Sequence, residues 1–180
     1  MKATIQFIGT ALVAFMIGQP AFAHRNEPSP SVPATIAVPA GYEVEVKFHA
    51  SGVQIYRCRP SARIAARFDW TFVAPDATLF DGDGKAVGRH YAGPTWEASD
   101  GSKVVGKEVA RVAAPNGSSL PWLLLTATVV QTGETFKRIG FLQRLHTNGG
   151  SAPTPVCTAD TADVEVRVPY TADYYFYSLR

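Results

Sequence analysis

Alternation of apolar and polar side chains is the feature that most constrains how this chain can fold. In the segment 42–48, aromatic and branched apolar residues take every second position, and charged residues stand between them. The segments 68–72 and 164–168 repeat this pattern. Successive side chains of a β-strand point to opposite faces, so each segment predicts a strand with one buried face.

Two further segments are apolar on both faces. The stretch 122–130 is apolar almost throughout and ends before a Thr-Gly turn. In the stretch 170–179, Tyr174 and Phe176 fall on one face of a strand, and Tyr175 and Tyr177 fall on the other. We therefore predict two strands that are covered on both sides, although periodicity alone also allows a buried helix in 122–130.

Turn-forming residues separate these segments, with Gly-containing pairs at 81–84, 93–94, 100–102, 116–117 and 148–150. Only the short segment 59–67 suits a helical turn. Many short strands divided by such turns predict an all-β fold, an antiparallel two-sheet sandwich of jelly-roll type, with a closed β-barrel as the alternative. The residues expected in its core are Trp70, Trp122, Val44, Val166 and Phe176.

The amino-terminal residues have the pattern of a secretory signal peptide. Lys2 precedes a short apolar run, and the tripeptide Ala21-Phe22-Ala23 provides a small-x-small cleavage site. We expect a signal peptide over 1–23, a Pro-rich extended segment over 24–40 and a single β domain over 41–180. The apolar run is too short to span a bilayer, so the expected location is the periplasm or the extracellular medium, with no membrane span.

Cys58 and Cys157 are the two cysteines of the sequence. In an exported chain an even number of cysteines predicts a disulfide. Two buried free thiols are the alternative. Neither cysteine lies in a Cys-x-x-Cys pair, so redox catalysis is not indicated.

Charge composition argues against nucleic acid as a partner. The whole chain has 17 basic and 15 acidic residues, and loss of the signal peptide removes Lys2 alone among them. The mature chain is therefore nearly neutral, and its basic residues are scattered rather than gathered into a phosphate-binding surface.

No catalytic or metal-binding motif stands out. The run Asp81-Gly82-Asp83-Gly84-Lys85 resembles the start of a calcium loop, but Lys85 occupies a ligand position, so a hairpin turn is the favoured interpretation. None of the four histidines has a second His or a Cys at metal-ligand spacing. We therefore predict no cofactor and no metal site.

Two loops have more functional side chains than turns require. They supply five candidate ligand-binding residues: His90, Tyr91, Trp96, His146 and Asn148. Loops on a rigid scaffold are common binding sites. The alternative is that the aromatic residues belong to the core and the glycines only form turns.

Two functional hypotheses follow. The first is a non-enzymatic binding or surface-associated module, with a saccharide or other small molecule as ligand, because aromatic faces stack on sugar rings and polar side chains bind hydroxyl groups. The second is a small secreted hydrolase that uses His90 or His146 with a carboxylate such as Glu97 or Asp100.

Seven short motifs along the chain, in this order, carry a family resemblance. They are Tyr56-Arg57-Cys58, Trp70-Thr71-Phe72 with Ala74-Pro75-Asp76-Ala77, His90 through Trp96, Asp100-Gly101-Ser102, Pro121-Trp122-Leu123-Leu124-Leu125, Thr147-Asn148-Gly149-Gly150 and Tyr170 through Tyr177. Together they resemble a secreted bacterial and fungal family known as domain of unknown function 3455. The resemblance implies an exported single domain with both cysteines in corresponding places, and it implies no particular activity.

Overall fold

A computed structural model describes residues 27–180, and the predicted signal peptide lies outside these residues. Its strands are β1 (Tyr42–Pro60), β2 (Phe68–Phe80), β3 (Ala86–Tyr91), β4 (Thr95–Ala98), β5 (Lys103–Val112), β6 (Trp122–Gln131), β7 (Ile139–Gly149) and β8 (Glu165–Leu179). The 3-10 turns are η1 (Ala34–Ile36) and η2 (Ala159–Thr161). The all-β prediction is confirmed. The helical turn expected within 59–67 is wrong, because Ser61 to Arg67 form a loop without helix.

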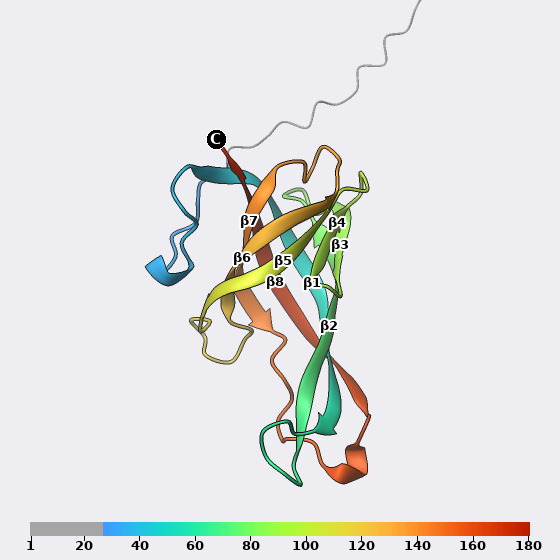
Figure 1. Cartoon of the computed structure of the whole chain (residues 1–180). Coiled ribbons are helices and arrows are strands. Elements are labelled where there is room, and N and C mark those ends of the chain that lie inside the picture. Colours follow the sequence, from blue (N-terminus) through green and yellow to red (C-terminus); the bar gives the residue numbers. More distant parts are fainter. Residues whose placement is uncertain (1–26) are drawn as a thin grey trace, which may run out of the picture.

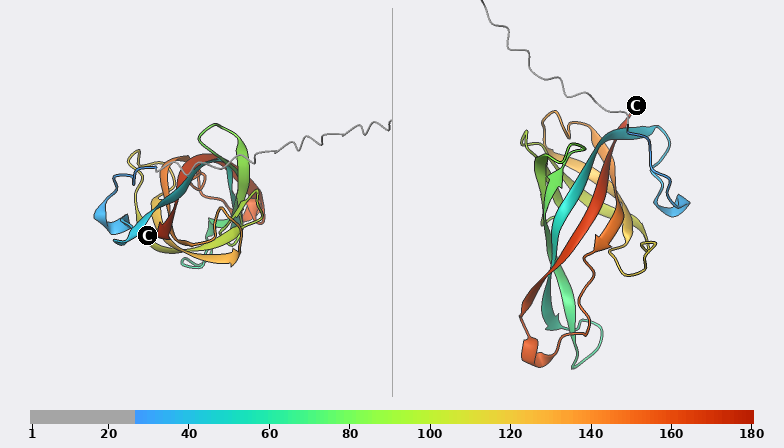
Figure 2. Two further views of the ribbon diagram at one scale, coloured as in Figure 1. Left: turned by 90° about the horizontal axis from the view of Figure 1, so that it is seen from above. Right: turned by 180° about the vertical axis from the view of Figure 1, so that it is seen from behind.

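The strands form one ring-like sheet (Figures 1 and 2). Every strand pairs antiparallel with its neighbours in the sequence, and β8 pairs with β1 to complete the ring. Short hairpin turns join several of the successive strands, whereas a longer connection joins β7 to β8. The turn from β2 to β3 is one of the short turns: the Asp81 carboxylate accepts hydrogen bonds from the backbone N–H groups of Asp83 and Lys85.

Three long strands extend beyond the ring. β2 pairs with β3 only over Ala77–Phe80, whereas its pairing with β1 continues to Phe68. β8 likewise continues along β1 after it leaves β7. This extension of β1, β2 and β8 projects from one end of the ring (Figure 1).

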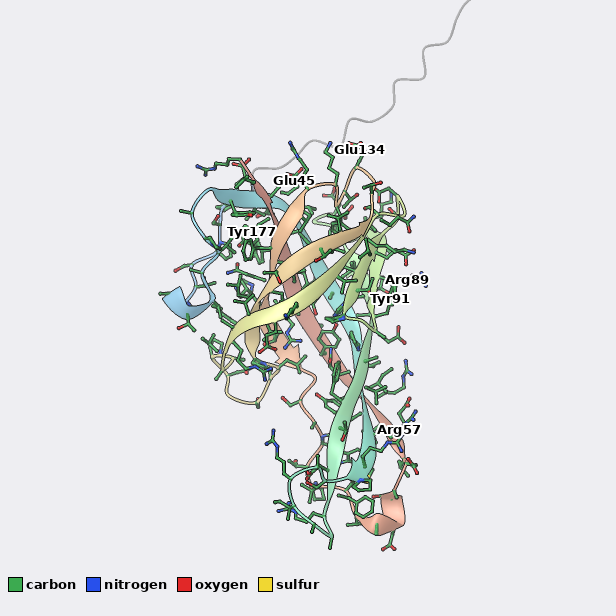
Figure 3. All side chains as sticks on the ribbon, in the orientation of Figure 1. Glu45, Arg57, Arg89, Tyr91, Glu134 and Tyr177 are labelled. Carbon is green, nitrogen blue, oxygen red and sulfur yellow. A yellow bond between two sulfur atoms is a disulfide. The ribbon has the colours of Figure 1, made fainter. Side chains whose placement is uncertain are left out.

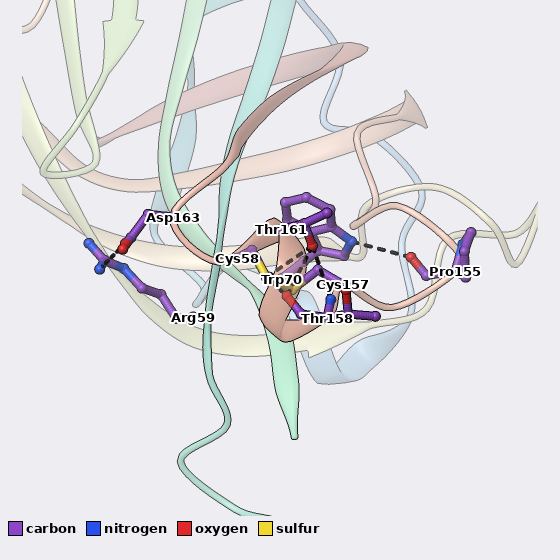
Figure 4. Close-up of a disulfide and its surroundings, with 8 residues drawn as sticks. All are labelled: Cys58, Arg59, Trp70, Pro155, Cys157, Thr158, Thr161 and Asp163. Atoms are coloured by element: carbon purple, nitrogen blue, oxygen red, sulfur yellow. Dashed lines mark hydrogen bonds and ion pairs between the residues drawn. A yellow bond between two sulfur atoms is a disulfide. The ribbon is translucent and has the colours of Figure 1, made fainter. Parts of the chain in front are cut away.

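A disulfide between Cys58 and Cys157 closes the far end of the extension (Figure 4). The two Cα atoms are 5.9 Å apart. Close by, the Trp70 indole N–H donates to the Pro155 carbonyl at 3.3 Å. The connection from β7 to β8 is thereby fixed against the extension.

Two apolar cores lie on the two sides of the sheet. The inner core lies inside the ring and includes Phe48, Trp96, Tyr174 and Phe176. The outer core includes Leu124, Leu145, Tyr175 and Tyr177, and it lies under the amino-terminal segment, whose Ile36 is fully buried. The prediction that β8 is covered on both faces is confirmed.

The Pro-rich segment before β1 is therefore packed on the sheet over its described part. The Gln143 amide donates to the Ile36 carbonyl at 2.6 Å and accepts a hydrogen bond from the Tyr177 hydroxyl. Ile36 also contacts the outer core through its side chain. A buried polar group needs such partners, and Gln143 has both of them.

Burial differs from the sequence prediction at several positions. Val44 and Phe176 are buried as expected, whereas Trp70, Trp122 and Val166 are only partly buried. In β6 burial on both faces is confined to Leu123–Leu125. Within residues 27–180 no helix has the length and apolar character to cross a membrane.

Candidate functional site

His90 and Trp96 lie inside the ring and not on a surface loop. They face each other from β3 and β4, and their rings stack with centroids 4.1 Å apart. His90 is 3% exposed and Trp96 is 1% exposed. The loop between them, residues 92–94, is only a hairpin turn, so neither ring offers a face to a ligand outside the sheet.

Burial also keeps His90 uncharged. It lowers the pKa of His90 to about 3, despite the opposing hydrogen bond to the Thr95 carbonyl. His90 Nδ1 lies 2.8 Å from that carbonyl oxygen and so carries the proton. A histidine that stays neutral near pH 7 is a poor general acid.

Tyr91 belongs to a polar cluster on the outer face, which we call the Glu97 cluster: Tyr91, Arg89, Glu97 and Lys103. The Glu97 carboxylate accepts hydrogen bonds from the Tyr91 hydroxyl at 2.9 Å and from Arg89 at 3.0 Å. Lys103 lies 3.8 Å from the same carboxylate. The hydrogen bond from Tyr91 lowers the pKa of Glu97, and the charges of Lys103 and Arg89 lower it further. Arg89 and Tyr91 project from the same side of the molecule in Figure 3.

Two adjoining hollows flank the Glu97 cluster. One has a volume of about 340 Å³ and is lined by the cluster together with Asp76 and His90. The other has a volume of about 380 Å³ and lies toward Gly88, Ser99 and Gly101. Both are open to solvent and include Arg89 and Glu97, so they adjoin on the outer face of β3 and β4, and we call the two hollows together the groove.

A second polar cluster centres on Asp173 of β8, and we call it the Asp173 cluster: Lys47, His49, His146 and Asp173. The two Asp173 oxygens lie 2.9 Å from His49 Nδ1 and 3.1 Å from His146 Nδ1. Lys47 Nζ lies 3.2 Å from the carboxylate. Burial alone would raise the pKa of Asp173, but the hydrogen bonds from both histidines and the contact with Lys47 lower it overall.

The backbone of β7 explains how His146 reaches Asp173. A register shift separates Leu145 from Asn148 in the pairing with β8, and His146 has a φ of 50°. A left-handed conformation is unusual for a residue other than glycine and is held in place by its surroundings. Asn148 is exposed beyond this bulge and pairs with Thr171.

The structure thus divides the residues singled out from the sequence. His90 and Trp96 lie in the core, Tyr91 lies in the Glu97 cluster, and His146 lies in the Asp173 cluster with Asn148 farther along β7. Glu97 and Asp100 do not contact His146; its carboxylate partner is Asp173.

Sequence reasoning missed His49 and Asp173 as site residues. They are 124 positions apart and meet because β1 and β8 are paired. The sequence predicts a strand near each of these residues, but their contact follows only from the register in which the two strands pair. Within residues 27–180 no group of three or more His, Cys, Asp and Glu side chains is arranged to hold a metal ion.

These features define an all-β domain built on a ring-like sheet, with a disulfide and with ionisable side chains gathered on its outside around two carboxylates. The chain belongs to the family described as protein of unknown function DUF3455, whose model matches residues 39–178. No curated protein and no solved structure matches the chain.

Proposed function

We propose that this domain is a non-enzymatic binding module that holds a saccharide or a similarly polar, uncharged small molecule in the groove along β3 and β4. The groove around the Glu97 cluster is the observation that carries the proposal. Small-molecule sites are concave and combine a few placed polar groups with an aromatic or apolar surface. Tyr91 supplies the aromatic ring, and Glu97, Arg89 and Lys103 supply the polar groups.

Charge balance supports an uncharged ligand. The 340 Å³ hollow is lined by two carboxylates, Asp76 and Glu97, and by two cations, Arg89 and Lys103. A ligand with a net charge would meet side chains of its own sign as well as side chains of the opposite sign. Hydroxyl groups, in contrast, donate hydrogen bonds to the carboxylates and accept them from the cations. The second hollow adjoins the first at Arg89 and Glu97, so a ligand of more than one sugar unit would contact both hollows.

Trp96 contributes no stacking surface to this site, because its ring is buried in the inner core. The saccharide proposal therefore rests on Tyr91 and the polar groups alone. The Arg89 guanidinium lies 5.5 Å from the centroid of the Tyr91 ring. A ligand that stacks on the same face of Tyr91 would have to displace it.

The test is a binding screen of the mature protein against neutral oligosaccharides, followed by calorimetry on any ligand found. We expect Glu97→Gln and Tyr91→Ala to weaken binding about tenfold or more, because each removes direct contacts with the ligand. Glu108→Gln is the matched control, since the Glu108 carboxylate is likewise paired with an arginine, Arg111. Binding that is equally weakened by the control, or absent throughout the screen, would contradict the proposal.

A second candidate function, a hydrolase, has support from the Asp173 cluster. Nδ1 of His146 and of His49 each faces an Asp173 oxygen, which leaves Nε2 available for general acid-base work. Ser51 and Thr171 lie one row away on the same outer face, opposite each other in the pairing of β1 with β8. In the described part of the chain, however, neither imidazole is hydrogen-bonded to a hydroxyl group.

Turnover of ester, glycoside and phosphate substrates tests this second function. The hydrolase reading requires that His146→Ala or Asp173→Asn abolishes turnover while circular dichroism shows an intact fold. Arg111→Met is a control at a distant exposed ion pair. Substrates that remain unchanged in the presence of the wild-type protein would leave the binding module as the only function supported.

We also propose export, with a mature chain that begins at His24 in the periplasm or outside the cell. The small-x-small site that ends at Ala23 supports it, and the disulfide is compatible with an oxidising compartment. Intact mass of the protein recovered from the periplasm or the medium tests both points. Retention of the residues 1–23 would contradict the proposed maturation.

A further inference from the structure

Arg144 of β7 points into the ring. It stands opposite Leu123 of β6 on one side and opposite Tyr174 of β8 on the other. Both neighbours belong to the inner core. Directly opposite residues of an antiparallel pair share a face of the sheet, so the Arg144 side chain enters the same interior.

Arg144 has no counter-charge in this interior. Its Nε and Nη2 donate to the Pro121 carbonyl at 3.2 Å and 3.0 Å, and within residues 27–180 it forms no ion pair. None of the buried residues of the described chain is an Asp or a Glu. A guanidinium that is partly withdrawn from water beside neutral groups alone, the Pro121 carbonyl and the Tyr174 hydroxyl, is costly, and an anion would offset that cost.

Three polar side chains near Arg144 have atoms that lack hydrogen-bond partners. These side chains are Gln54, Tyr170 and Tyr174, all at least 98% buried, and the atoms are Gln54 Nε2 and the two tyrosine hydroxyls. Nearly all buried polar groups are paired with protein or water, so three unpaired ones in a single region need an explanation.

These groups lie close together. Tyr170 and Tyr174 share the inner face of β8, and Gln54 of β1 lies one row along from the position opposite Tyr170. Burial raises the pKa of Tyr170 and of Tyr174, and the positive charge of Arg144 opposes this rise in both. The two tyrosine side chains also act on each other, and Gln54 acts on Tyr170, although none of these contacts is a hydrogen bond of normal length. The guanidinium is therefore near enough to act on both hydroxyl groups.

We propose that Arg144, Gln54, Tyr170 and Tyr174 form a binding site for a small oxyanion, a carboxylate or phosphate group, inside the ring. All four side chains can donate hydrogen bonds, and an oxyanion accepts several at once, most strongly from a guanidinium. One such anion supplies both the missing counter-charge and the missing acceptors. This site is independent of the groove around Glu97, which lies on the outer face.

Calorimetric titration of the mature protein with sodium phosphate and, separately, with sodium acetate tests the site. We expect one anion to bind per chain, and the anion that binds identifies the group as phosphate or carboxylate. Arg144→Met should weaken binding about tenfold or more, since it removes the charge and keeps the length of the side chain. Arg111→Met is the matched control, because Arg111 is exposed and already paired with Glu108.

Tyr170→Phe and Tyr174→Phe keep the test valid if Arg144→Met does not fold. Each removes a hydroxyl that makes no hydrogen bond of normal length in the free protein, so the free protein should be nearly as stable as the wild type, while anion binding weakens about threefold to tenfold. A purely structural role would change stability and leave binding unaltered. The proposal is overturned if neither anion binds, or if both tyrosine variants bind as the wild type does.

Discussion

At the scale of single residues, His90 shows how burial controls ionisation. Its folded pKa of about 3 is below the ordinary value of 6.5. Between these values the unfolded chain binds a proton that the folded protein excludes, so folding stability decreases as the pH falls from 6.5, by up to about 1.4 kcal/mol per pH unit. Urea unfolding at pH 6.5 and pH 5 measures this, and His90→Gln should reduce the difference. If His90→Gln shows the same difference in stability between the two pH values as the wild type, the claim that His90 is buried and neutral is wrong.

Asp100 also makes stability depend on pH, although the sequence suggested it as a catalytic carboxylate. Burial alone would raise its pKa, but hydrogen bonds from Ser102 and Thr135 lower it to about 2. Its contribution to stability is thus present above about pH 4 and is lost as the pH falls toward 2. Asp100→Asn should have a lower Tm than the wild type at pH 7, and the difference should be much smaller at pH 2. Asp160→Asn, at an exposed carboxylate of η2, is the control that should show no such convergence.

At the scale of elements, the amino-terminal segment acts as part of the outer core. Ile36 has no exposed surface and packs with Leu124 and Leu145. Truncation of a fully buried isoleucine costs about 2 to 5 kcal/mol, so Ile36→Ala should lower the free energy of unfolding by that amount. Val32→Ala, at a partly buried position of the same segment, should cost less. If neither variant lowered the free energy of unfolding, the segment would not be held on the sheet in solution.

The strands themselves show which parts of the fold were predictable. The alternation in β8 correctly placed Tyr174 and Phe176 on one face and Tyr175 and Tyr177 on the other. The same rule put Val44 and Val46 on one face, which is wrong, because a bulge between them places Val44 in the outer core and Val46 against the inner core. A bulge adds one residue to a strand and leaves no mark in the alternation of residue types.

The site was less predictable than the fold for a related reason. Trp96 and His90 flank a Gly-Pro turn, which suggested a binding loop, but inward positions of paired strands are decided by register. His49 and Asp173 meet only across the pairing of β1 with β8. Such contacts between distant residues depend on the closure of the ring, and local pattern does not encode it.

At the scale of the whole molecule, the disulfide links β1 to the long connection before β8. Cys58 and Cys157 are 99 positions apart, and closure of so large a loop stabilises a fold by up to about 4 to 5 kcal/mol. A Cys58→Ser, Cys157→Ser double variant should therefore unfold at a lower urea concentration than the wild type. Reduction of the wild-type protein should have the same effect. A urea midpoint that is unchanged in both experiments would contradict a stabilising role of the disulfide.

The central claim is that the outer groove along β3 and β4 binds an uncharged polar ligand without altering it. Chemical-shift mapping of the mature protein with a neutral oligosaccharide from the screen tests this most directly. We predict that the perturbed backbone amides gather in β3 and β4, around Arg89, Tyr91 and Glu97, and that the oligosaccharide is recovered intact. Perturbations centred instead on His49, His146 and Asp173, together with conversion of the ligand, would contradict the account.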